Sequence, residues 1–387
     1  MNPRPPIWRR GSRIAAILVA AAGLAAAGAT TGVTAAQAAT VSGVHVSASP
    51  KTNPYSPAYR HAYRNGAVPT RRAASAMRSW AASHAPAASS RNLRYGGAVD
   101  GIGVTTGAEK VYLVFYGSQW GTQGTGTNGN VTLSGDPSGM AGVLQQLFKG
   151  LGTGGELWSG VMTQYCQGVA TGATSCPASN AQHVAYPTGG ALAGVWVDES
   201  AASPSQASAA QLGAEAVRAA AHFGNTSATA NRNAQYVIVS PTGTHPDGFD
   251  TSSGQFCAWH DYNGDVGVGS SYGDIAFTNL PYVTNAGTSC GANFVNSGTA
   301  GRDDGVSIVE GHEYAETITD QNPAGGWTDR TGYENGDKCA WITPGTTGGS
   351  ADLSLPTGTF AMQTTWANDA GSGSGGCEFS HAIVSNG

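Results

Sequence analysis

The chain has 387 residues, of which 40% are hydrophobic and 11% charged, and a formal net charge of −5. Twelve of its 19 Lys and Arg residues lie at or before Arg94, whereas the first acidic residue is Asp100. The part from Asp100 onward therefore holds 7 basic and 24 acidic residues. Because nucleic acid and anionic lipid would repel such a domain, we expect neither nucleic acid nor a membrane as a partner.

The N-terminus has the pattern of an export signal. Four arginines precede an apolar run over about residues 14–27, and Ala36-Gln37-Ala38 follows as an A-x-A cleavage site. A membrane anchor is the alternative, but the run is shorter than the roughly 18 to 20 residues that span a bilayer. We therefore predict a signal peptide over residues 1–38 and a secreted protein, extracellular or associated with the cell wall.

Residues 39–91 form a basic segment rich in Ala, Ser and Pro. Periodic apolar residues are scarce in it, which is typical of chains that bury too little surface to fold. The sequence predicts a disordered basic linker or a propeptide here. Its charge would also suit a pro-segment that lies across an acidic cleft.

Residues 92–387 are expected to form a single domain with alternating strands and helices. Apolar runs predict strands over 110–120, 191–200 and 234–243, and a strand from 254 that turns at Asn263-Gly264. Helices are predicted from Asp136-Pro137 to Gly150, from Ser203-Pro204 to Phe223, and over 303–320. This order predicts an α/β (α+β) fold, a mixed β-sheet with packed helices, similar to the architecture of zincin metallopeptidases.

Six cysteines all lie in the acidic part of the chain, namely Cys166, Cys176, Cys257, Cys290, Cys339 and Cys377. An even number in an exported chain predicts disulfides, and we expect each cysteine to pair with its neighbour in sequence. The chain has no C-x-x-C motif that would favour a thiolate metal cluster.

The segment "GHEYAE", residues 311–316, is an HExxE variant of the HExxH zinc motif. On a helix His312 and Glu316 project from one face and could bind one divalent ion, while Glu313 would be the general base for metal-bound water. Glu334 is the preferred third ligand, because it follows Glu316 by 18 residues, a spacing similar to that in one class of zincins. Asp337 would orient His312 or be a ligand itself, and Gly311 would allow close approach.

The metal ion itself is less well determined by these residues. Zinc is expected, but one histidine with two carboxylates is a hard donor set, so calcium, manganese and iron remain open. The alternative is an acidic helix without a metal, in which His312 packs in the core and Glu313 and Glu316 face solvent. His260, in "HDY", could supply a transition-state donor.

Five stretches resemble, in the same order, the phosphate-induced protein 1 (Exordium-like) family: "NLRYGGAV" (92–99), "VYLVFYGSQW" (111–120), "FCAWHDY" (256–262), "GHEYAE" (311–316) and "ENGDKC" (334–339). The resemblance implies a secreted or wall-associated protein and supplies no established reaction. Plant members usually have Leu in place of Tyr314 and other residues in place of His260, so the resemblance makes His260 a poor candidate for a shared role.

Two hypotheses follow. The first is a secreted, monomeric zinc metallopeptidase-like hydrolase that acts on a peptide or protein substrate. The second is a non-catalytic Exordium-like protein in which the same residues hold a structural metal, and which binds a cell-wall glycan or another cell-wall component.

Overall fold

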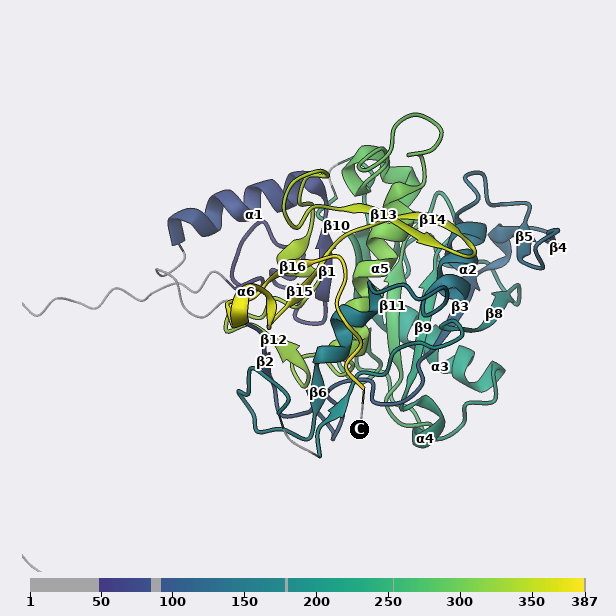
Figure 1. The fold of residues 1–387 in the computed structure, drawn as a ribbon. Helices are drawn as coiled ribbons and strands as arrows, with labels where there is room; N and C mark the ends of the chain where they lie inside the picture. Colours follow the sequence, from purple (N-terminus) through teal and green to yellow (C-terminus); the bar gives the residue numbers. More distant parts are fainter. Residues whose placement is uncertain (1–48, 85–91, 178–179, 253, 386–387) are drawn as a thin grey trace, which may run out of the picture. The chain divides into compact units, whose positions relative to one another are not determined.

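The centre of the fold is a six-stranded mixed sheet with the order β1-β10-β11-β9-β3-β8 (Figure 1). The computed structural model describes residues 49–84, 92–177, 180–252 and 254–385. Four strands run parallel: β3 (Lys110–Tyr116), β8 (Leu192–Asp198), β9 (Ala234–Val239) and β11 (Ala276–Leu280). Two further strands extend the sheet beyond β11. β10 (Phe256–Tyr262) is antiparallel to β11, and β1 (Asn65–Pro69), at the edge, is antiparallel to β10.

The predicted strands are present. The apolar runs of β3 and β9 are buried on both faces, as expected of central parallel strands. The strand from 254 ends at Tyr262, directly before Asn263-Gly264, and returns antiparallel as β11. The chain is therefore a mixed α/β protein with a mixed sheet.

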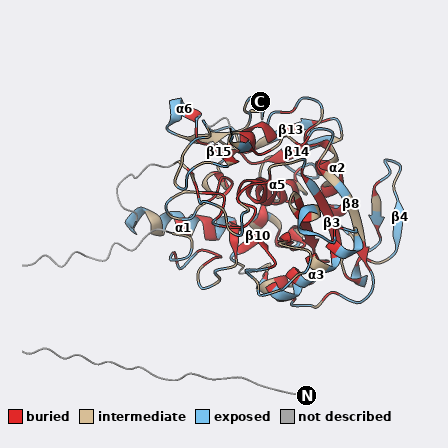
Figure 2. Cartoon of the chain, turned by 90° about the horizontal axis from the view of Figure 1, so that it is seen from below, coloured by how far each residue is buried: buried red, intermediate tan, exposed pale blue. Residues whose placement is uncertain are grey.

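Helix α5 (Asp304–Thr319) carries the HExxE motif and lies between the sheet and a hairpin. It contacts β10, β1 and β11 on one side and β14 (Gly358–Met362) of the β13–β14 hairpin on the other. All sixteen of its residues are buried (Figure 2). The predicted 303–320 helix is confirmed, but it has no solvent face, so its three glutamates are inside the protein.

Two further helices show how local sequence sets helix boundaries. The expected start of α2 at Asp136-Pro137 is wrong, because the helix spans Met140–Gly150, but the Asp136 carboxylate does accept the N–H groups of residues 139, 140 and 141. The expected start of α3 at Ser203 is wrong, because the helix spans Ala209–His222 and Ser208 forms a capping box with Gln211.

The remaining elements are short. The helices are α1 (Arg71–His84), α4 (Ala228–Asn231) and α6 (Ala370–Gly373). The strands form five two-stranded pairs: β2 (Arg94–Tyr95) with β12 (Trp327–Thr328), β4 (Gln123–Thr125) with β5 (Val131–Leu133), β6 (Cys166–Gln167) with β7 (Gln182–His183), β13 (Ala351–Leu355) with β14, and β15 (Thr365–Ala367) with β16 (Gly376–Glu378).

Three disulfides confirm the nearest-neighbour pairing. They are Cys166–Cys176, Cys257–Cys290 and Cys339–Cys377. The second attaches β10 to the 3₁₀ turns that precede α5, and the third anchors the segment carrying Glu334 and Asp337 to β16. Among the described residues, no helix has the length and apolar character needed to span a membrane.

The basic segment differs from the sequence-based expectation. Residues 49–84 are folded, with β1 paired to β10 and α1 following directly, so the prediction of disorder is wrong for this part. Its composition is misleading because β1 is specified by long-range pairing with β10 and not by its own short "NGAVP" sequence. Residues 1–48, which include the predicted signal peptide, and residues 85–91 lie outside the described residues.

Candidate metal centre

Helix α5 and the loop after β12 bring all five predicted site residues together. His312, Glu313 and Glu316 are fully buried, Glu334 is 2% exposed, and the Asp337 side chain is 8% exposed. The alternative in which Glu313 and Glu316 face solvent is therefore wrong. Two overlapping groups have donor atoms within 4.8 Å of one another: His260, Glu313 and Glu316, and His312, Glu316 and Asp337.

The Glu316 carboxylate is shared by both groups. Its Oε1 accepts the backbone N–H of Asp337 at 2.7 Å, which fixes the orientation of the carboxylate. Its Oε2 lies 3.0 Å from His312 Nε2 and 4.0 Å from His260 Nε2. Within the described chain this oxygen has no hydrogen-bond partner. A buried carboxylate oxygen that faces two imidazole nitrogens is an arrangement that a shared cation would stabilise.

His312 is held in one orientation by Gln363. The Gln363 amide donates to Gly336 O at 2.9 Å and to Thr364 O at 3.2 Å, so its Oε1 faces His312 Nδ1 at 3.1 Å. The Nδ1–H of His312 then donates to Gln363, which leaves the lone pair of Nε2 directed at the cluster. Hydrogen bonding of the other ring nitrogen is usual in metal-bound histidines, and Gln363 gave no local sequence signal.

His260 is the residue that the sequence analysis undervalued. It projects from β10, is fully buried, and places Nε2 3.2 Å from Glu334 Oε2. Its Nδ1 has no hydrogen-bond partner among the described residues. Only the pairing of β10 with β11 and the packing of α5 across the sheet bring it to His312, so no local spacing could have identified it.

Donor atoms that share one small divalent ion must lie close to one another. Ligands at 2.0–2.1 Å from a tetrahedral ion are about 3.3 Å apart. The separations here are 3.0 Å for His312–Glu316, 3.2 Å for His260–Glu334, 3.8 Å for His312–Asp337 and 4.0 Å for His260–Glu316. Each of the two groups could therefore hold a divalent ion through the shared Glu316, but among the described residues no set of donor atoms within 4.8 Å contains both His260 and His312.

Close approach in the cluster depends on Gly336 and not on Gly311. A Cβ on Gly336 would lie 2.9 Å from His312 Cγ and 3.0 Å from Glu316 Oε1. A Cβ on Gly311 would instead meet Met362, away from the candidate ligands. The expectation for Gly311 is thus wrong, and the glycine of "ENGDKC" brings Glu334 and Asp337 against α5.

Burial dominates the electrostatics of the cluster. It raises the pKa values of Glu313, Glu316 and Glu334 well above the usual range, and neighbouring carboxylates add to the effect. Burial, with Glu316 nearby, raises the pKa of Asp337 to about 8. The pKa of His260 falls to about 3 through burial and the proximity of His312. Without a cation the carboxyls therefore retain protons near neutral pH, while His260 stays neutral.

Two other acidic residues downstream of the motif have structural partners. Asp320 accepts the backbone N–H groups of Ala324, at 2.9 Å, and of Gly326. Asp329 pairs with Lys338 at 3.0 Å and accepts the Thr331 hydroxyl at 2.6 Å. Neither is part of the cluster.

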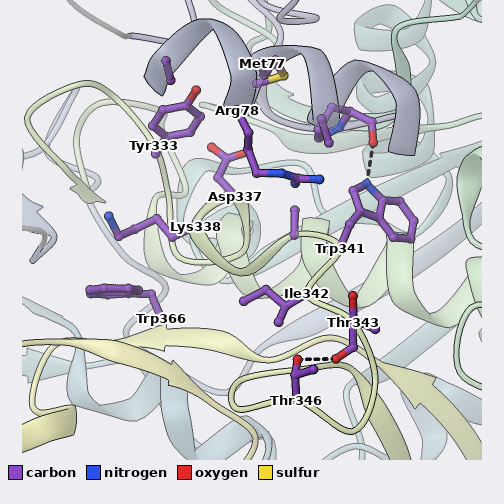
Figure 3. A pocket seen from close by; sticks show the side chains of 14 residues that line it. Met77, Arg78, Tyr333, Asp337, Lys338, Trp341, Ile342, Thr343, Thr346 and Trp366 are labelled. Atoms are coloured by element: carbon purple, nitrogen blue, oxygen red, sulfur yellow. Dashed lines mark hydrogen bonds between the residues drawn. The ribbon is translucent and has the colours of Figure 1, made fainter. Parts of the chain in front are cut away.

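A cavity of about 680 Å³ adjoins the cluster at Asp337 (Figure 3). One wall is α1, with Met77 and Arg78, and the other includes Trp341 and Trp366. Among the candidate ligands Asp337 alone lines this cavity, so the cavity brings solvent to one edge of the cluster. No protein-family model, curated protein or solved structure matches the chain.

Proposed function

We propose that the protein is a secreted, metal-dependent hydrolase that cleaves peptides or proteins. The observation that carries this proposal is the orphaned Oε2 of Glu316, buried between the Nε2 atoms of His260 and His312. The mixed sheet with its antiparallel strand beside the motif helix is similar to the zincin arrangement and supports the same conclusion. The Exordium-like resemblance and the three disulfides agree with an extracellular or wall-associated life.

His260 changes the expected ion preference. An ion that took both His260 and His312 with Glu316 would have two imidazoles and one carboxylate, the set that binds catalytic zinc in several peptidases, and would require the two imidazoles to move closer than in this structure. Glu334 or Asp337 would complete the site. This set is softer than one histidine with two carboxylates, so zinc is favoured over calcium and manganese.

Glu313 is positioned to accept a proton. It precedes Tyr314 on α5, one residue after His312, and its carboxyl lies within 4.8 Å of donor atoms of His260 and Glu316. A bound divalent ion would supply an acidified water and polarise a substrate carbonyl. The raised pKa of the Glu313 carboxyl, caused by burial, suits a group that takes up a proton near neutral pH.

A non-catalytic protein with a structural ion is the second candidate, and one observation favours it. The backbone oxygen of Gly66 lies 3.2 Å from His312 Nε2, where an open coordination position would be needed. In that case the ion would stabilise the fold, and the function would be binding of a cell-wall component.

Elemental analysis by mass spectrometry tests the metal site. We expect one equivalent of zinc in the mature chain purified without chelator, and none in the His312→Ala and His260→Ala variants. His183→Ala, at a buried histidine outside the cluster, is the matched control and should keep the metal. Absence of metal from the parent after exposure to zinc, manganese and calcium would refute the site.

A Glu313→Gln variant separates the two candidate functions. It should retain zinc but lose at least a hundredfold in hydrolysis of any peptide that the parent cleaves, because the proton acceptor is gone. Zinc binding without hydrolysis in the parent would favour the structural ion.

A further inference from the structure

The N-terminal segment passes directly through the candidate metal centre. In β1 the carbonyl of Gly66 points at His312 Nε2, 3.2 Å away. A Cβ on Gly66 would lie 2.1 Å from Glu316 Oε2 and 2.5 Å from His260 Nε2, and its φ of +51° also favours glycine. One strand thus lies against three candidate ligands, His312, Glu316 and His260.

The pairing of β1 with β10 is irregular at this point. Asn65 pairs with His260 and Val68 with Ala258, so two residues of β1, Gly66 and Ala67, stand opposite Trp259 alone. This bulge turns the Gly66 carbonyl toward α5. If β1 were absent, β10 would be the edge of the sheet, with unpaired backbone groups beside His260. Such an edge accepts an extended peptide as an added strand.

The attachment of this segment to the body is uneven. Arg64 is its main polar anchor, with Nε 2.7 Å from Asp247 Oδ2 and Nη2 2.7 Å from Asp247 O. Trp341 Nε1 donates to Pro69 O at 2.7 Å. Beyond β1, however, the cavity of about 680 Å³ separates much of α1 from the loop around Trp341 and Trp366 (Figure 3). Close packing, which is normal for an integral layer, is missing there.

The charge of the segment differs from that of the body. Residues 49–84 contain six basic and no acidic residues, whereas the chain from Asp100 onward is strongly acidic. Attraction between the two would favour docking of the segment even though its shape fit is incomplete.

We propose that residues 49–84 are an inhibitory segment of this chain, with β1 occupying the position on β10 that an extended polypeptide substrate would take at the metal centre. The proposal rests on the proposed function and names its substrate class as an extended peptide. Activation would require cleavage after α1 and departure of the segment, which would free the β10 edge and the Nε2 of His312. The propeptide that the sequence predicts as one alternative would thus inhibit the metal centre by occupying the substrate position.

The test uses the chain without its predicted signal peptide but with residues 49–84. The recognition sequence of a site-specific protease is inserted between His84 and Asn92. Cleavage leaves every other residue in place. The chain is compared intact and cleaved, as parent and as Arg64→Ala, which removes the Asp247 anchor. Arg60→Ala is the matched control, because Arg60 has the same charge but is exposed and stacks only on Tyr59 of its own segment.

We expect the cleaved Arg64→Ala chain to release the fragment in gel filtration and to hydrolyse an unstructured protein at least tenfold faster than the intact chain. Tryptophan fluorescence should change on release, because Trp341 loses its bond to Pro69 O. A synthetic peptide of residues 62–70 should restore inhibition, and the Arg60→Ala chain should behave as the parent.

Two results would overturn the proposal: loss of the folded state on release, which would make β1 an integral strand, or hydrolysis that is equal before and after release. Metal content, measured on the same samples, separates this failure from that of the proposed function. Zinc present with unchanged activity refutes inhibition alone, whereas absence of zinc from both the intact and the cleaved chain refutes the metal centre and the inhibition that depends on it.

Discussion

The carboxyl groups at the two ends of the loop over residues 329–337 are buried beside different partners. At one end Asp329 is largely buried, but the Lys338 ammonium at 3.0 Å and the Thr331 hydroxyl outweigh burial and hold its pKa below the usual range. At the other end Asp337 and Glu334 face the histidines of the cluster, and the pKa of Asp337 rises to about 8. Lys338 follows Asp337 directly, yet its ammonium lies at Asp329 and over Trp366.

This difference supports the proposed metal centre. At Asp329 the chain provides a lysine that keeps the carboxylate ionised. At the HExxE cluster, histidines are the only basic side chains among the described residues that lie within 4.0 Å of the carboxyl oxygens, and no lysine or arginine does. Since burial keeps the pKa of His260 near 3, that histidine cannot provide a positive charge at neutral pH. A divalent ion would provide it.

Removal of the ion should have the largest effect. At a metal concentration about 1,000 times the dissociation constant, binding to the folded state alone stabilises it by about 4 kcal/mol. We therefore expect a chelator to lower the melting temperature by about 6 °C, as measured by calorimetry. His312→Ala should melt at the same temperature with and without chelator. An unchanged melting temperature of the parent would contradict an ion at the cluster.

The pH dependence of the free energy of unfolding should differ between the metal-free and the zinc-bound chain. A carboxyl whose folded pKa is raised, such as Asp337 at about 8 against 3.8, holds more protons in the folded than in the unfolded state between these values. Stability of the chelated chain should therefore fall as pH rises from about 4 to about 8, by up to about 6 kcal/mol for the full shift. With zinc bound the carboxylates are already ionised, so this fall should disappear. Urea titrations at pH 5 and pH 8 measure both cases.

At Asp329, stability should depend on Lys338 and not on a bound metal ion. Lys338→Met leaves a mostly buried carboxylate without its cation, and we expect a loss of about 2 kcal/mol at pH 7 in urea unfolding, with and without chelator. Its zinc content should stay at that of the parent. If zinc restored the stability that Lys338→Met loses, Lys338 would act on the metal cluster. The two ends of the loop would then not differ in their source of positive charge.

Features with short-range causes were predictable from sequence. The limits of α5, the capping carboxylate of Asp136 and the disulfide pairs follow from periodicity, side-chain chemistry and loop length. His260 and Gly66 were not, because they reach the cluster only through strand pairing on β10. Composition wrongly predicted disorder for β1. Its five residues have no strong strand pattern of their own and form a strand because they pair with β10.

Gln363 provides the finest test of the comparison, because it acts on the cluster without contributing a charge. Gln363→Ala removes the acceptor for His312 Nδ1–H, so the ring loses its fixed orientation and Nε2 is directed at the ion for less of the time. Loss of such a partner typically lowers metal affinity at least tenfold, which is the effect expected in a zinc titration against a competing chelating dye. Gln235→Ala is the matched control: Gln235 is also fully buried, and it donates to Thr317 on the same helix. Both variants should lose stability, but Gln363→Ala alone should lose affinity. Equal zinc affinities in the two variants would mean that His312 is oriented by packing and not by its hydrogen bond, and that the cluster requires less preorganisation than its geometry indicates.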